Sequence, residues 1–206
     1  MGIYLNPGNE GFKEAVRSKI YVDKTGLIGC VNELIGTLDK YICVSRPRRF
    51  GKSMALKMLA AYYDRSCDSE ELFAGFQIAD DPSFREHLNQ YDVIYLNMQQ
   101  FLIEAEPGKV TEYLEQEVCQ ELRDEYGGIL GEQNRRLAAA LRRIYAATGM
   151  CFVVLIDEWD CVMRERQEAE GLQKQYLDFL RNLLKDQPYV ALAYMTGILP
   201  VKKYGE

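Results

Sequence analysis

Residues 41–53 read YICVSRPRRFGKS, a short apolar run followed by a basic loop. The run at 41–44 is β-branched and aromatic, which is typical of a buried strand. A helical pattern starts near Lys52, with apolar residues at Leu56, Leu59, Ala60 and Tyr63. A strand, a basic loop and an amphipathic helix are therefore expected to follow one another directly.

The end of this loop, Gly51-Lys52-Ser53, matches the end of the phosphate-binding pattern G-x-x-x-x-G-K-[ST]. Glycine allows a turn that aims backbone N–H groups at phosphate oxygens, and the following helix start adds partial positive charge. Lys52 would bring charge to the terminal phosphates, and the Ser53 hydroxyl can ligate magnesium. Arg46 stands where the pattern has its first glycine. The alternative is a basic surface turn.

We predict that the loop and the first helical residues bind a nucleoside triphosphate, ATP with Mg²⁺. The predicted binding residues are Arg46, Pro47, Arg48, Arg49, Phe50, Gly51, Lys52, Ser53 and Met54.

Two acids follow the most apolar run of the chain. A buried strand is expected at 151–156, and Asp157 and Glu158 come next. Carboxylates directly after a buried strand are costly unless a cation or water uses them. We therefore predict that Asp157, with Ser53, holds the magnesium, and that Glu158 polarises the attacking water as general base. The alternative is a solvent-exposed acid pair.

A last strand is expected at 189–195, followed by Thr196-Gly197. A polar residue at this place can sense the terminal phosphate, and Thr196 is the candidate. The alternative is a helix cap. Together with Glu158 and Lys52, Thr196 completes the predicted catalytic residues.

The remaining pattern predicts the fold class. A second buried strand is expected at 93–96, and amphipathic helices are expected at 24–38, 110–126, 137–145 and 172–184. Alternating strands and helices predict an α/β fold with a parallel sheet covered on both faces, the three-layer αβα sandwich of P-loop NTPases. The motif order, and the Glu after the Asp, favour the ASCE/AAA-like branch, which inserts a strand between the two motif strands. We expect an N-terminal extension with a first helix at 1–39 and the ATPase core at 40–206.

Composition narrows the class of ligand. The 206 residues carry a formal charge of −6, which argues against a general nucleic-acid coat. Residues 40–66 alone carry +6, which favours one anionic ligand at one place. The sequence contains no apolar run of about 18 residues, so no membrane span is predicted. The six cysteines form no C-x-x-C pair and are expected to be reduced thiols of a cytoplasmic protein.

With these motifs assembled, the chain resembles the predicted AAA-ATPase-like family of bacterial proteins. The segments that carry the resemblance are 21–25 with Leu27-Ile28, 45–53, 155–160 and 196–198. The resemblance makes Arg46 normal for the family and implies ATP and magnesium as ligands. Trp159 stands where the family more often has Tyr.

Longer members of that family carry a C-terminal domain that resembles PD-(D/E)xK nucleases. This chain ends at Glu206, so the helical lid, a second sensor, an arginine finger and that domain are expected to be absent. The expected function is ATP hydrolysis coupled to a conformational step. The alternatives are a nucleotide-gated regulatory module with little hydrolysis, or a loop that is mainly structural. A protein partner or a second copy of the chain is also considered.

Four further residues have weaker expectations. Asp23 either caps the 24–38 helix or belongs to a segment against the adenine ring. Asp160 is either an acid that supports the site or an ion-pair partner of Arg48 or Arg49. Asn97 faces the ligand edge, and His87 is assigned no function.

Overall fold

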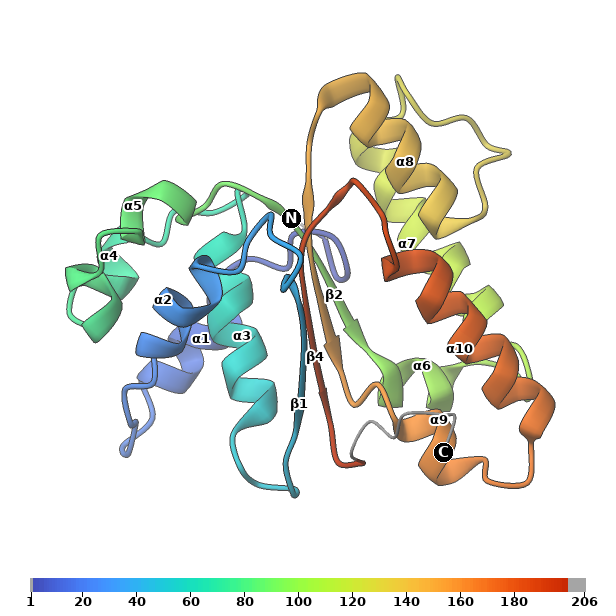
Figure 1. Ribbon diagram of the computed structural model, residues 1–206, viewed down its shortest axis with the longest axis horizontal. Coiled ribbons are helices and arrows are strands. Elements are labelled where there is room, and N and C mark those ends of the chain that lie inside the picture. Colours follow the sequence, from blue (N-terminus) through green and yellow to red (C-terminus); the bar gives the residue numbers. More distant parts are fainter. Residues whose placement is uncertain (1, 200–206) are drawn as a thin grey trace.

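Four parallel strands form one sheet in the computed structural model, which describes residues 2–199. The sheet order is β1-β4-β3-β2 (Figure 1). The strands are β1 (Tyr41–Ser45), β2 (Asp92–Asn97), β3 (Phe152–Asp157) and β4 (Val190–Gly197).

Strand β4 separates the strand before the basic loop from the strand that ends in Asp157. Val44 pairs with Thr196 on one side of β4, and Ile156 pairs with Met195 on the other. Strand β2 lies between the two motifs in sequence but pairs with the outer side of β3. All four carboxyl ends therefore meet at one edge of the sheet.

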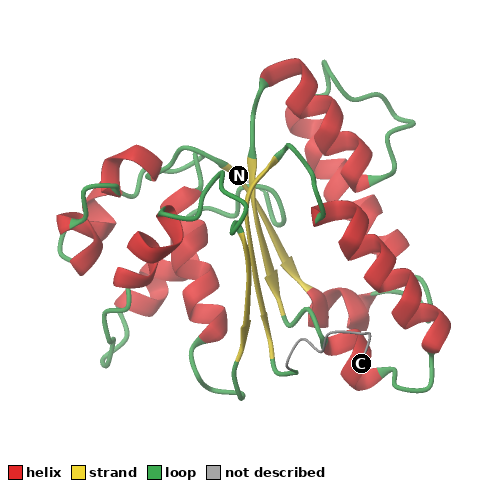
Figure 2. Cartoon of the chain, viewed as in Figure 1, coloured by secondary structure: helices red, strands yellow, loops and turns green. Residues whose placement is uncertain are grey.

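Helices cover both faces of the sheet, as the alternating pattern predicts (Figures 1 and 2). One face carries α1 (Glu10–Val16), α2 (Gly26–Asn32), α3 (Lys52–Tyr63), α4 (Glu70–Phe73), the 3₁₀ helix η1 (Gln77–Asp80) and α5 (Phe84–His87). The other face carries α6 (Met98–Glu104), α7 (Val110–Tyr126), α8 (Leu137–Thr148), α9 (Cys161–Glu165) and α10 (Glu170–Leu184).

The alternation of side chains along β3 produces two separate cores. Val153 and Leu155 pack with α3, whereas Val154 and Ile156 pack with the helices of the opposite face. Every residue of β3 is buried. Burying a Val, Leu or Ile side chain stabilises a protein by about 1.5–3 kcal/mol. A strand of this composition is therefore stable only at the centre of a two-sided layer.

Helix α3 buries the positions that its sequence pattern singles out. Leu56, Leu59, Ala60 and Tyr63 are all buried. This packing fixes the helix against the sheet, so its first turn, with Lys52 and Ser53, is held at the carboxyl edge of β1.

The first predicted helix is shorter than its pattern indicates. Helix α2 ends at Asn32, and the chain then turns, with Gly36 at φ 71° and its N–H donating to the Ala191 carbonyl. Leu38 is 96 % exposed. The helical spacing fails after Asn32 because the chain must turn back to enter β1.

Asp23 does not cap α2, contrary to one of the two expectations. Its Oδ1 accepts hydrogen bonds from the N–H and hydroxyl of Thr25, and its Oδ2 accepts one from Gln77 N–H. Asp23 therefore ties the segment before α2 to η1.

The N-terminal residues add to the sheet and to one core. Leu5 forms an antiparallel bridge with Ile94 of β2. Helix α1 packs on α3 through Phe12, which is fully buried. The division of the chain at residue 39 remains a prediction.

Two further properties concern the part of the chain that the structure describes. Within residues 2–199, no helix has the length and apolar character needed to cross a bilayer. All six cysteines lie in this range and are unpaired.

Candidate functional site

The loop between β1 and α3 contains two residues in the left-handed region of backbone space. Arg49 has φ 70° and Gly51 has φ 77°. A Cβ on Gly51 would meet only the Lys24 Nζ, at 4.0 Å. Glycine is needed there for its backbone conformation rather than for space, because left-handed φ is unfavourable for other residues.

The end of this loop presents backbone donors that the protein itself leaves open. Among the described residues, the N–H groups of residues 51–54 donate no hydrogen bond, whereas Ala55 N–H donates to the Gly51 carbonyl at 3.0 Å. The first N–H groups of a helix lack partners within the helix and carry partial positive charge. This arrangement suits an anion.

Lys52 folds back across the loop. Its Nζ donates to the carbonyl oxygens of Arg46, at 2.8 Å, and Pro47, at 2.9 Å. The ammonium group is thereby held above the loop by neutral acceptors, and a phosphate oxygen could replace either one.

The basic side chains of residues 40–66 differ in whether an acceptor group of the protein pairs with them. Lys40 Nζ donates to the Val190 carbonyl at 2.6 Å, and Arg65 Nε pairs with Asp92 at 2.6 Å. Within residues 2–199, Arg46, Arg48 and Arg49 have no ion-pair partner, and all three are exposed. Positive charge is therefore concentrated at the phosphate loop.

Asp157 ends β3 and is held by its neighbours. Its Oδ1 accepts hydrogen bonds from the Thr196 hydroxyl, at 2.6 Å, and from Glu158 N–H, at 3.1 Å. Asp157 is 3 % exposed, and burial of the phenol, together with the Asp157 charge, raises the pKa of Tyr95 on β2.

The Thr196 hydroxyl uses its one proton on Asp157. No helix begins at Thr196 within the described residues, so the structure does not support the helix-cap alternative. Its observed role is to orient the Asp157 carboxylate.

Strand β4 connects the phosphate loop to the acidic strand end. Arg46 N–H donates to the Gly197 carbonyl at 3.1 Å, and the preceding residue, Thr196, binds Asp157. Adjacent strands are about 4.8 Å apart, so the carboxyl ends of β1 and β3 lie roughly 10 Å apart, across β4. Figure 1 shows the loop and the end of β3 at the same edge of the sheet.

Glu158 is turned toward α9. It has φ 53°, and its Oε2 accepts a hydrogen bond from Arg164 in an ion pair. Asp160 also faces Arg164, with Oδ1 at 3.4 Å from Nε. The expected pairing of Asp160 with Arg48 or Arg49 is therefore wrong, because α9 brings a nearer guanidinium.

Sequence reasoning missed Arg164. Its only signal is its position in the helix directly after the acidic strand end, four residues from Asp160. Burial lowers the pKa of Arg164, but the charges of Asp160 and Glu158 outweigh burial and raise it. Arg164 therefore stays charged beside both carboxylates.

The sequence model of the predicted AAA-ATPase family matches residues 8–205. The chain belongs to this family. It is also 31 % identical, over 193 residues, to an uncharacterized protein in the vnfD 5′ region of Azotobacter chroococcum mcd 1. That match covers 89 % of this chain and 34 % of the relative, so the chain spans about a third of the relative's length.

The donor groups at this edge of the sheet are of the chemical kinds that suit a magnesium nucleotide. Open backbone N–H groups and free cations suit phosphate. The Ser53 hydroxyl and the Asp157 carboxylate are the hard oxygen ligands that magnesium prefers. Within residues 2–199, no group of three or more His, Cys, Asp or Glu side chains is placed to hold a metal ion by itself.

Two of the residues with weaker expectations, Asn97 and His87, make contacts within the fold. Asn97 caps α6, since its Oδ1 accepts hydrogen bonds from Gln99 N–H and Gln100 N–H. The His87 Nδ1 lies 2.8 Å from the hydroxyl of Tyr91, the residue before β2, and so lies toward the amino ends of the strands. Asn97 still lies opposite Asp157 in the sheet register.

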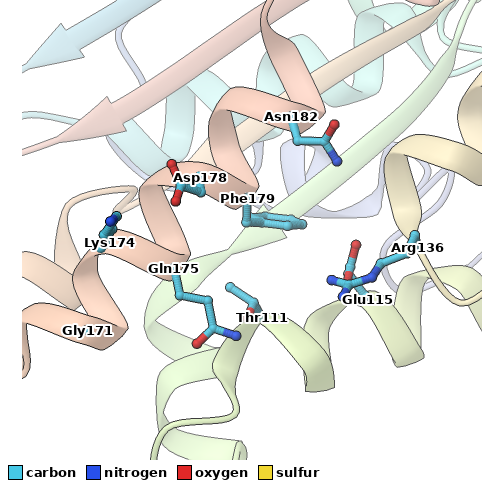
Figure 3. A pocket seen from close by; sticks show the side chains of 9 residues that line it. All are labelled: Thr111, Glu115, Arg136, Gly171, Lys174, Gln175, Asp178, Phe179 and Asn182. Atoms are coloured by element: carbon cyan, nitrogen blue, oxygen red, sulfur yellow. The ribbon is translucent and has the colours of Figure 1, made fainter.

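A separate pocket lies between α7 and α10 and has a volume of about 460 Å³ (Figure 3). Thr111 and Glu115 come from α7, and Gln175 and Asp178 come from α10. None of the predicted nucleotide-site residues lines it. It is therefore a different feature from the edge that carries the phosphate loop.

Proposed function

We propose that this chain binds ATP with magnesium at residues 46–54 and hydrolyses the β–γ phosphoanhydride. One observation carries the proposal: β4 links the two halves of the site. Arg46 N–H binds the Gly197 carbonyl, and the Thr196 hydroxyl binds Asp157. The anion-binding loop and the buried acid are thereby held at one edge.

Each group has a distinct role in this proposal. The N–H groups of residues 51–54 and the Lys52 ammonium bind the phosphates. Ser53 and Asp157 hold the magnesium, and Thr196 keeps the Asp157 carboxylate in place. Bound magnesium would neutralise charge on the terminal phosphates.

Glu158 is the proposed general base. It removes a proton from water as the water oxygen attacks the terminal phosphorus and the bond to the bridging oxygen breaks. A conformational step coupled to this reaction is part of the proposal, because Glu158 must leave the ion pair in which it is found. The strand order, with β4 between β1 and β3, supports the ASCE/AAA-like branch.

A second function is favoured by that same ion pair. While the Glu158 carboxylate is paired with Arg164, it is not free to contact an attacking water. The alternative is therefore a nucleotide-gated module with little hydrolysis, acting on a protein partner or a second copy. The activity of any longer protein that contains this domain is likewise a proposal.

Titration calorimetry with ATP, ADP and GTP, with and without magnesium, tests binding. We expect magnesium-dependent binding of ATP. Steady-state phosphate release then separates the two functions: Glu158→Gln should abolish turnover and preserve binding. Negligible turnover in the parent chain would favour the gated module, and absence of nucleotide binding would contradict both. Lys57→Ala is a matched control, since Lys57 is an exposed lysine of α3 outside the loop.

A further inference from the structure

The Glu158–Arg164 ion pair is sheltered from solvent. The Arg164 side chain is 15 % exposed and that of Glu158 is 26 % exposed. Partly buried pairs of this kind are screened by salt much less than surface pairs. The contact therefore persists in salt and helps to hold the Glu158 carboxylate beside α9.

The same guanidinium also faces a second carboxylate, that of Asp160, through Nε rather than through the terminal nitrogen that pairs with Glu158. Asp160 is fully buried, and its Oδ2 accepts hydrogen bonds from Ile198 N–H, at 2.8 Å, and Leu199 N–H, at 2.6 Å. Its Oδ1 lies 3.4 Å from Arg164 Nε. Within the described chain, however, both of these buried atoms lack a hydrogen-bond partner. An unmet buried donor beside an unmet buried acceptor is unfavourable, and a small movement of Arg164 would relieve both.

We propose that Arg164 is a positioning residue with two alternative ion-pair partners, Glu158 and Asp160. On Glu158 it holds the general base away from the attacking water. When ATP with magnesium binds, the guanidinium shifts toward Asp160 far enough that its terminal nitrogen leaves Glu158, and Glu158 is released toward the water. The inference rests on the proposed function, in which Glu158 is the base. Arg164 remains paired with a carboxylate in both positions, so the movement leaves no buried charge alone.

Trp159 lies between Glu158 and Asp160 in the sequence and can report the movement. It is the only tryptophan of the chain. Its N–H donates to the Thr196 carbonyl at 3.0 Å, its carbonyl accepts from the Tyr176 hydroxyl at 2.8 Å, and its buried indole Nε1 lacks a partner among residues 2–199. A Cβ on Gly197 would lie 2.6 Å from that Nε1. The indole therefore packs closely on the end of β4 and should respond when Glu158 or Arg164 moves.

The decisive experiment compares three variants by phosphate release and ATP affinity. Arg164→Gln removes the restraint, so kcat should rise by about threefold or more with the ATP Kd unchanged. Asp160→Asn weakens the second ion-pair partner of Arg164 but keeps an oxygen that can accept from Ile198 N–H and Leu199 N–H. We therefore expect kcat to fall by about tenfold. Adding Arg164→Gln to Asp160→Asn should restore kcat, because no guanidinium remains on Glu158.

This reversal separates positioning from packing. If Arg164 only stabilised the fold, both single variants would lower kcat and the double variant would be lower still, which would overturn the proposal. Arg166→Gln is the matched control, because Arg166 is an exposed arginine just after α9 and should leave all constants unchanged.

Trp159 emission gives a readout that does not need turnover. ATP with magnesium should shift the emission of the parent, the shift should be lost in Asp160→Asn, and it should return in the double variant. ATP binding by calorimetry with no emission change in the parent would overturn this proposal alone. Failure of ATP to bind at all would instead overturn the proposed function on which it rests.

Discussion

The Thr196 hydroxyl donates a hydrogen bond to Asp157 Oδ1 at 2.6 Å, from β4 to β3, with both side chains almost fully buried. Asp157 therefore arrives at the sheet edge already oriented. The other protein donor to this oxygen is Glu158 N–H, at 3.1 Å. Removing the Thr196 hydroxyl would thus remove the closer of these two contacts.

Thr196→Val keeps the shape of the side chain and removes its hydroxyl. We expect a loss of about 1–3 kcal/mol in the free energy of unfolding, because a buried carboxylate oxygen loses a donor. We also expect weaker magnesium-dependent ATP affinity. Urea unfolding and calorimetry measure the two effects. Thr196→Ser should keep both near the parent values, and a Thr196→Val protein indistinguishable from the parent would contradict the role of this contact.

Lys52→Ala removes the ammonium group that lies over the loop. A charge-assisted hydrogen bond contributes about 1.5–3 kcal/mol, so ATP affinity should fall roughly 10- to 150-fold. Calorimetry measures the affinity, and Lys57→Ala should have little effect. Equal losses in the two variants would show that only the general charge of α3 matters.

Gly51→Ala tests the backbone conformation of the loop. A left-handed conformation costs an alanine about 1–2 kcal/mol, and the loop can relieve that strain only by moving its N–H groups. We therefore expect lower ATP affinity. Gly108→Ala is the matched control, because Gly108 also has positive φ, at 82°, and open space around its Cβ position. The prediction fails if both variants bind ATP as the parent does.

His87 should make stability depend on pH below neutrality. Burial lowers its pKa in the folded protein, despite the nearby Glu86 carboxylate. The neutral form is favoured on folding, so the contribution is complete above the unfolded pKa of about 6.5 and is lost as pH falls through the lower folded value.

Urea unfolding at pH 7.5 and pH 5.5, compared between the parent and His87→Gln, measures this contribution. His87 is the only histidine, so the substitution should reduce the loss of stability on acidification. Other titrating groups, such as Glu115, are common to both proteins. Identical pH dependence in the two proteins would contradict the assignment.

Much of the fold could be predicted from local pattern. The predicted helix at 110–126 is observed as α7 (Val110–Tyr126), and the strand predicted at 151–156 is observed as β3 (Phe152–Asp157), one residue further along the chain. These elements have strong periodicity and large apolar contacts, so local and tertiary preferences agree. The helix at 24–38 was predicted less well, because the return of the chain to β1 is a tertiary requirement.

The candidate site could be proposed from sequence where its residues form one continuous segment of the chain, and its role in binding stays a prediction. The Gly51-Lys52-Ser53 motif is such a segment, because a phosphate loop joins one strand to the next helix. The pairing of Asp160 was not predictable, since its partner depends on the direction of α9 after Trp159. Thr196 was singled out for the terminal phosphate, whereas its contact with Asp157 depends on the register of β3 and β4.

The sequence by itself determined a two-sided parallel α/β layer and the residues that end its strands, because apolar periodicity and motif spacing are local properties of a chain. Only the tertiary structure decided that β4 lies between the two motif strands and that Arg164 holds Glu158. Strand order and the partner of a buried charge are set by packing between distant segments, and no local pattern encodes which segment arrives there.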